Sequence, residues 1–434
     1  MHLEFGSVER RRRVRVWIAA HTAGVLCTSP MFVTAQQVQA PTRPAVADSG
    51  RTAITLDQAI AAALRANPEL LTARLRVDSA RGERRIASAW PNPTFAASPS
   101  NPTQYVVQLP LDIGAARHFR VKAGMHGLNA ASLDAADTRR QVVFAVRQAF
   151  YDALLADSLR RLADDQADVF RRLLAADSVR LRTGSIAERE VVATRLQLAH
   201  AMALVSRSGV QQHATRLALE TLIGMTTPDT SLLTAGQLAY RAIDVPADSL
   251  LALSFLQRPD YLASSERLHQ SASALAAARA ALVPTPVVGG VYQPAQPFGS
   301  GSHVAPSIGV TIPLFDSFRG EQMRAAASRA AAEVAIERTR TQIRSEVTQA
   351  FDSYRSARQL ADQYACGLLA DASTALEAAR YAYDHGATAL AELLEAIRAY
   401  GDTRSDYLTA VHDYWVSLFA LERAAGVDFV REAP

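Results

Sequence analysis

The sequence predicts a mainly α-helical protein with a small β portion, built from two copies of one unit in the order helix, strand pair, long helix, helix. Residues 115–182 and 318–385 contain no proline and are rich in alanine, arginine, leucine and acidic residues, most of which favour helices. Two stretches of alternating apolar and polar residues precede each segment, which indicates strands. Because the whole pattern recurs about 200 residues later, the chain is expected to be a tandem repeat.

The first 35 residues have the pattern of a secretory signal. Five arginines at positions 10–15 precede a mostly apolar stretch, residues 16–33, and Val33-Thr34-Ala35 offers a small-residue cleavage site. An uncleaved anchor is the alternative, although polar residues interrupt the stretch. Lipid attachment at Cys27 is disfavoured because Leu26 stands where a lipidation motif has a small residue.

The charge and the cysteine content narrow the class of protein. The chain carries a net charge of +4, and the signal segment holds five arginines and two glutamates, so the remainder is near +1 and gives no argument for nucleic acid as a partner. Cys366 alone remains after cleavage, so no internal disulfide is possible. No run of 18 apolar residues follows the signal, so a membrane-spanning form would have to be a closed barrel.

The internal duplication extends far beyond the strands. The pattern of Val142, Val146 and Phe150 returns 201 residues later, and Gly184 returns as Gly386 at an offset of 202. The predicted divisions are the signal at 1–35, an N-terminal linker at 36–53, repeat 1 at 54–225, an inter-repeat segment at 226–253, repeat 2 at 254–426 and a C-terminal tail at 427–434.

Each repeat is expected to open with a helix that leads into the strand pair. In repeat 1 this helix runs over 56–89, capped by Thr55 and kinked or restarted at Pro68. The strands are expected at residues 94–98 and 105–113 and, in repeat 2, at 286–292 and 304–314. A half-buried strand of a soluble sheet and a membrane strand both fit such alternation.

The long segments after the strands predict coiled-coil helices. A continuous helix over 115–182 or 318–385 would be about 100 Å long, which a globular domain cannot bury. Apolar residues recur at steps of three and four, and Gly184 and Gly386 mark the turns from which a second helix returns. A coiled-coil scaffold without a barrel is the alternative, but it leaves the signal and the alternating strands unexplained.

Four strands cannot close on themselves. The smallest outer-membrane barrels have about eight strands, and an open sheet would expose unpaired edges to lipid. Several copies of the chain are therefore expected to share one barrel, with the long helices packed around the same axis.

With these features the sequence resembles the outer-membrane efflux proteins of the TolC type, including the outer components of heavy-metal exporters. The resemblance covers residues 54–426 and rests on the duplicated layout, the Leu109-Pro110-Leu111 and Ile312-Pro313-Leu314 strand ends and the two glycine turns. It implies a homotrimer in the outer membrane with a 12-stranded barrel and a periplasmic helical tunnel. The implied partners are outer-membrane lipid, a periplasmic adaptor (membrane fusion) protein and an inner-membrane pump. The implied adaptor-docking tips are Arg182, Gly184, Ser185, Gly386 and Ala387.

The resemblance also implies an acidic ring at the periplasmic aperture. Glu392 and Glu395 lie three residues apart, hence on one helix face, at positions where family members carry acidic residues. Three copies would give two rings that favour cations. Two solvated carboxylates at a helix start, where the helix dipole stabilises them, are the alternative. Glu190 matches Glu392 in repeat 1, whereas Ala193 matches Glu395.

A gate contact between the helix pairs is implied at Glu190 and Tyr383, which match family positions. The matching arginine is absent, and Thr388 takes its place, so the contact is expected to be either missing or built differently. An aromatic residue that packs between helices with its hydroxyl bonded is the alternative for Tyr383.

The sequence shows no enzyme motif, and we expect no catalytic residue, cofactor or metal ligand. The ten histidines are scattered without paired ligand spacing. The expected function is a passive exit duct for an efflux system. A periplasmic coiled-coil adaptor or structural protein is the main alternative and an exported hydrolase a weaker one, and the sequence does not identify the exported compound.

Overall fold

The computed structural model describes residues 53–100, 103–225, 232–295, 299, 301–312 and 317–429. The predicted signal at 1–35 lies outside these ranges, as does almost all of the linker at 36–53. The first half contains β1 Ala53–Ile54, α1 Leu56–Ala66, α2 Pro68–Ser88, β2 Thr94–Ser98, β3 Gln104–Pro110, α3 Ala115–Arg182 and α4 Glu188–Leu222. The second contains β4 Leu233–Thr234, the 3₁₀ turn η1 Ala247–Ser249, α5 Leu250–Gln257, α6 Pro259–Ala280, β5 Thr285–Gln293, β6 His303–Thr311, α7 Arg319–Gln363, the π turn η2 Tyr364–Leu368, α8 Leu369–Asp384 and α9 Leu390–Ala425.

The helix expected over 56–89 is two helices, because Pro68 has no N–H and pushes the preceding residue out of helical geometry. Asn67 lies between them and is 3% exposed. Its Oδ1 accepts from the backbone N of Glu69 at 2.9 Å and caps α2, while its Nδ2 donates to the carbonyl of Leu222 at the end of α4, at 3.0 Å. One side chain thus serves unpaired backbone groups at two helix ends.

In repeat 2 a cation, Arg258, stands at the position that Asn67 has in repeat 1 and also bonds a backbone group at a helix end. Arg258 precedes Pro259 as Asn67 precedes Pro68, and its Nη1 donates to the carbonyl of Ala424 at the end of α9, at 3.1 Å. The buried guanidinium also pairs with Asp260 and Glu346, at 2.6 and 2.8 Å. These two carboxylates offset the cost of burying the charge.

The four longer strands form one antiparallel sheet in the order β2-β3-β5-β6. The central pair, β3 and β5, joins the two repeats, with Tyr105 opposite Tyr292 and Leu109 opposite Val288. The strand expected over 105–113 ends at Pro110, the residue that cannot donate to a ladder. The last residues expected for the final strand, 313–314, lie outside the described ranges.

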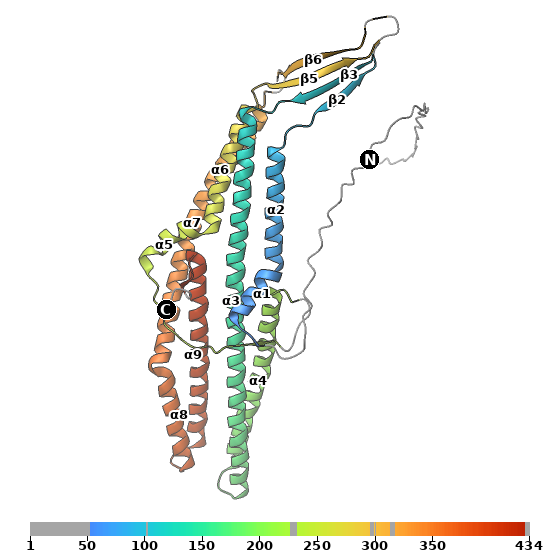
Figure 1. Ribbon diagram of the computed structural model, residues 1–434. Helices are drawn as coiled ribbons and strands as arrows, with labels where there is room; N and C mark the ends of the chain where they lie inside the picture. The colour runs from blue at the N-terminus through green and yellow to red at the C-terminus, as the bar shows by residue number, and fades with distance from the viewer. Residues whose placement is uncertain are drawn as a thin grey trace, which may run out of the picture. The chain divides into compact units, whose positions relative to one another are not determined.

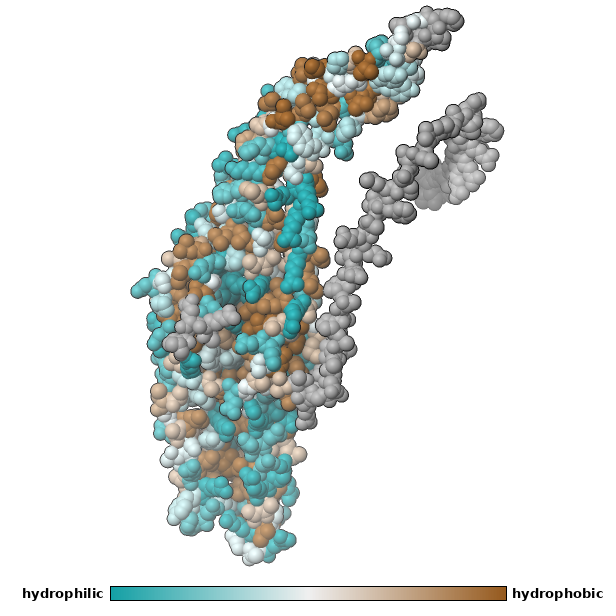
Figure 2. Space-filling view, viewed as in Figure 1, coloured by the Kyte–Doolittle hydropathy of each residue, from teal (hydrophilic) through white to brown (hydrophobic). Residues whose placement is uncertain are grey.

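One face of this sheet is apolar and exposed. Residues opposite each other in an antiparallel pair share a face, and the register puts large apolar side chains of all four strands on the same one. Tyr105 stacks between Phe95 and Tyr292, with 6.2 Å between ring centroids on each side. Figure 2 shows hydrophobic residues gathered over the strands. The apolar face consists of Phe95, Tyr105, Val107, Leu109, Val288, Tyr292, Val304, Ile308 and Val310, all at least 36% exposed.

The two long helical segments differ. Helix α3 runs without a break for 68 residues. The helix expected over 318–385 is interrupted by the π turn η2, in which Gly367 leaves helical geometry at φ 178° and ψ −46°. Glycine is a poor helix former, and the matching stretch of α3 contains none. This difference between the repeats was not predicted.

The buried core lies where helices of both repeats meet the inter-repeat segment. Strands β1 and β4 pair in parallel, and Leu238 and Ile243 pack with α7 and α9. The Tyr414 hydroxyl accepts from the backbone N of Ile243 at 2.9 Å, and Trp415 Nε1 donates to the carbonyl of Ala239 at 2.9 Å. The described part of 226–253 is therefore packed structure and not only a connection.

Figure 1 shows the four strands at one end of α3 and the turn between α3 and α4 at the other end. The turn between α8 and α9 lies at the same end as the α3–α4 turn. Among the described residues, no helix combines the length and the apolar character that a membrane crossing requires.

Candidate functional site at the helical turns

The two turns at this end are copies of one hydrogen-bonding motif. In the first, the N–H groups of Gly184 and Ser185 donate to the carbonyls of Leu181 and Arg180, at 3.0 and 2.9 Å. The second repeats this geometry, with Gly386 and Ala387 donating to Tyr383 and Ala382 at 3.0 and 2.8 Å. This is the Schellman arrangement, which needs a left-handed residue at its centre.

Glycine supplies that conformation in both turns. Gly184 has φ +73° and Gly386 has φ +71°, and nothing lies within 4 Å of the place where a Cβ would stand. The residues predicted as adaptor-docking tips, Arg182, Gly184, Ser185, Gly386 and Ala387, are all exposed. The structure therefore presents two matching, solvent-facing turns, built from equivalent segments of the two repeats.

The two predicted aperture glutamates lie on the solvent side of α9. Glu392 and Glu395 are exposed, whereas Leu393 and Leu394 between them are buried. Thr388 Oγ1 donates to the Glu392 carboxylate, and Glu395 lies 3.6 Å from Arg398 Nη1. The described partner of Glu392 is thus a neutral hydroxyl, while Glu395 has a cation, Arg398, beside it.

Tyr383 is buried and its hydroxyl donates to Oδ1 of Asp177 on α3, at 3.2 Å. Asp177 is fully buried, and its Oδ2 accepts from Thr194 Oγ1 on α4 at 2.7 Å. The carboxylate therefore joins α8 of repeat 2 to both helices of the repeat 1 hairpin. The sequence had indicated Glu190 as the partner of Tyr383; that pairing stays a prediction, and the described bond of the hydroxyl is to Asp177.

The surroundings keep the Tyr383 hydroxyl protonated. Burial and the nearby Asp177 carboxylate raise its pKa, and the Arg180 guanidinium, 5.0 Å from the ring centroid, opposes this in part. The hydroxyl is therefore a hydrogen-bond donor at neutral pH. The Tyr383 ring belongs to a cluster of apolar side chains from α3, α4, α8 and α9 that includes Phe170, Leu390 and Ile397.

A groove of about 460 Å³ separates α3 from α8 and α9 beside this contact. Tyr383, Leu393 and Tyr400 line one side, and Leu162 and Leu173 the other. The α3–α4 pair thus contacts the α8–α9 pair at Asp177 and at the apolar cluster, and the two pairs are less closely packed at the groove.

Asp177 is the residue that sequence reasoning missed. The signal for it was present, because Asp177 continues the three- and four-residue steps of buried Phe170 and half-buried Leu173 along α3. A carboxylate on the buried stripe of a helix needs a partner. Its partners come from 17 and 206 residues away, so their identity required the fold.

The comparisons with known proteins agree with this architecture. Residues 59–225 and 250–427 match the family described as Outer membrane efflux protein. The cobalt-zinc-cadmium resistance protein CzcC of Cupriavidus metallidurans is 22% identical over 380 residues, covering 86% of this chain and 90% of CzcC.

Solved structures share the fold. The CmeC outer membrane channel of Campylobacter jejuni has a TM-score of 0.74 at 18% identity, covering 87% of this chain and 88% of CmeC. The open state of the MtrE outer membrane channel of Neisseria gonorrhoeae has a TM-score of 0.71 at 21% identity, covering 86% of this chain and 89% of MtrE. The predicted resemblance is confirmed: with both repeats matched over most of their length, this protein belongs to the outer membrane efflux protein family.

Proposed function

We propose that this outer membrane efflux protein is the passive exit duct of a tripartite exporter, in which three copies of the chain share one 12-stranded barrel and one periplasmic helical tunnel. The observation that carries the proposal is the sheet β2-β3-β5-β6, whose one face is apolar and exposed and whose outer strands, β2 and β6, have no partner on their free edges within the described chain. Such a face suits lipid, and such edges need neighbouring strands.

The contact of Asp177, Thr194 and Tyr383 is proposed as the latch that holds the tunnel closed at its periplasmic end. It joins α8 to the hairpin of α3 and α4, the two parts that would have to separate for the entrance to widen. A hydrogen bond from a neutral donor to a buried carboxylate is worth about 1.5–3 kcal/mol, which is enough to bias a two-state gate without locking it.

Glu392 and Glu395 are proposed to form acidic rings at the entrance, and the two turns to dock the adaptor. The exposure of both glutamates supports the first proposal, and the exposed copies of one turn support the second. The name of CzcC refers to cobalt, zinc and cadmium, whose divalent cations an acidic entrance would favour.

The duct itself is tested with the full chain purified in detergent. An unboiled sample on an SDS gel is expected to run as a trimer and a boiled one as a monomer, because shared strand pairing resists SDS. In planar bilayers the trimer should give stepwise currents. A monomeric, water-soluble product without currents would refute the duct and favour the coiled-coil adaptor.

Tyr383→Phe is expected to raise the open probability, since it removes the hydroxyl bonded to Asp177. The loss of about 1.5–3 kcal/mol corresponds to roughly a 10- to 100-fold shift toward the open state per chain. Single-channel recordings measure it. Tyr381→Phe is the matched control, because Tyr381 is on the same helix but 68% exposed. Equal currents in both variants and wild type would show that Tyr383 serves packing alone.

Glu392→Gln with Glu395→Gln is expected to weaken cation preference, because each chain loses two negative charges from the entrance. Reversal potentials under KCl and CoCl₂ gradients measure the preference. Glu392→Gln alone should account for most of the change, since Arg398 already offsets Glu395. The ring assignment fails if the double variant keeps the wild-type reversal potential.

Gly184→Val or Gly386→Val is expected to weaken adaptor binding, since a β-branched residue is strained at φ near +70° by roughly 1–2 kcal/mol and distorts the tip. Co-purification with the adaptor measures this. Gly184→Asn and Gly386→Asn are the controls, because asparagine tolerates this conformation. All variants should remain trimers; normal adaptor recovery with the valine variants would count against docking at the tips.

A further inference from the structure

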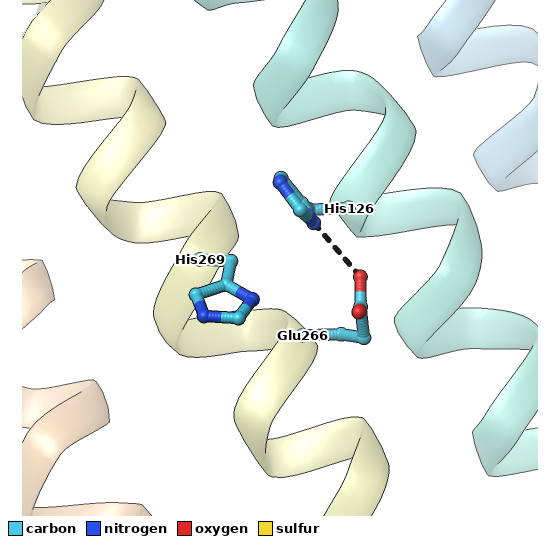
Figure 3. A group of neighbouring side chains, drawn as sticks. All are labelled: His126, Glu266 and His269. Carbon is cyan, nitrogen blue, oxygen red and sulfur yellow. Dashed lines mark hydrogen bonds and ion pairs between the residues drawn. The ribbon is translucent and has the colours of Figure 1, made fainter.

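Two histidines and a glutamate converge between α3 and α6, far from the helical turns (Figure 3). His126 Nδ1 lies 2.8 Å from Glu266 Oε2, and the rings of His126 and His269 are 5.2 Å apart. One ligand atom from each of the three residues can be chosen so that all three atoms lie within 4.8 Å of one another. Glu266 and His269 are three residues apart, so they share one face of α6; Figure 3 shows Glu266 extending toward His126 on α3 and the His269 ring lying beside α6.

The neighbouring residues hold this cluster together. Asn129 Nδ2, one turn along α3 from His126, donates to the same Glu266 oxygen at 3.2 Å and orients the carboxylate. Gly127 lets the helices approach, because a Cβ there would stand 2.9 Å from Gln270 Nε2. One helical turn further on, Arg267 pairs with Asp134 across the same interface. His126 and Glu266 are thus held in place by hydrogen bonds, and the exposed His269 ring lies against His126.

The three side chains offer ligands that suit a divalent cation of intermediate softness, such as Zn²⁺. Two imidazoles and one carboxylate are the protein ligands of known His₂Glu zinc sites, in which water completes a tetrahedral shell. The His126 and Glu266 side chains are 13% and 24% exposed, and His269 is exposed, so water and ions can reach the open side. A cation bound to His126 Nδ1 and Glu266 Oε2 would replace the hydrogen bond between these two atoms.

We propose that His126, Glu266 and His269 form a binding site for Zn²⁺ or a similar divalent transition-metal cation, which ties repeat 1 to repeat 2 beneath the sheet. His126 is 11 residues after the start of α3, and His269 is 11 residues before the end of α6. At 1.5 Å per residue, both lie about 16 Å from the helix ends that lead to strands β3 and β5. A bound cation would therefore brace the two helices that support the β3–β5 junction. The site belongs to a single chain and does not depend on the proposed duct.

The test uses the full chain, purified in detergent without a histidine tag and stripped with a chelator. Competition with a chromophoric zinc chelator should give one Zn²⁺ per chain, and Co²⁺ should give the visible absorption of a bound, low-symmetry ion. His269→Ala and Glu266→Gln should each weaken Zn²⁺ binding by at least about 10-fold, a loss that even residues outside the ligand shell cause. Asn129→Ala should weaken it less.

His213→Ala is the control, because His213 is an exposed histidine on α4, away from the cluster. His269→Ala leaves the His126–Glu266 hydrogen bond in place, so its helical circular dichroism should match wild type. Zn²⁺ should raise the Tm of wild type and of His213→Ala but not of His269→Ala. The absence of stoichiometric binding in wild type, or equal affinity in wild type, His269→Ala and Glu266→Gln, would overturn the site.

Discussion

The unpaired edges of the four-stranded sheet constrain the rest of the molecule. Backbone N–H and C=O groups need partners, and the free sides of β2 and β6 have none in the described chain. In water these edges would recruit other chains, and in lipid they could not persist. The exposed apolar face of the same sheet makes lipid the better surroundings. The proposed closure by further copies would satisfy both conditions, and the long helices would then have a common axis to pack around.

The contacts between the two repeats differ in strength between the middle of the molecule and the helical turns. Near the middle, large aromatic residues and the largely buried ion pair of Arg147 on α3 with Glu422 on α9 hold the repeats together, and breaking them would be costly. At the turns, Asp177 is a buried carboxylate whose described partners are two hydroxyls. Hydroxyls compensate a buried charge less fully than a cation does. The contact at the turns is therefore the weaker of the two, which agrees with its proposed role as a latch.

Local patterns in the sequence predicted much of this fold, and contacts between distant segments account for what was missed. Alternation located the strands, and Gly184 and Gly386 located turns whose geometry only a left-handed residue satisfies. The break at Asn67 was partly anticipated from Pro68, but its bond to Leu222 was not, since 155 residues separate them. Similarly, His126 and Glu266 are 140 residues apart, so no ligand spacing was visible along the chain.

Several candidate functional residues lie where the two repeats differ, although Glu392 matches Glu190 and the two glycine turns match each other. The turns, the helix-ending caps and the strand pairs are duplicated, and they build a nearly symmetric frame. By contrast, Tyr383 corresponds to Leu181, Asp177 to Ala379 and Glu395 to Ala193, at the offset of 202 that relates the two turns. At the same offset, His126 corresponds to Ser328. A duplicated chain must keep the residues that both copies need for folding, whereas a latch, a charged entrance or a bridging cation needs unlike side chains that face each other. Divergence between the repeats is therefore a sequence signal for Asp177, Tyr383, Glu395 and His126, whereas the duplicated turns are recognised by their exposed glycines.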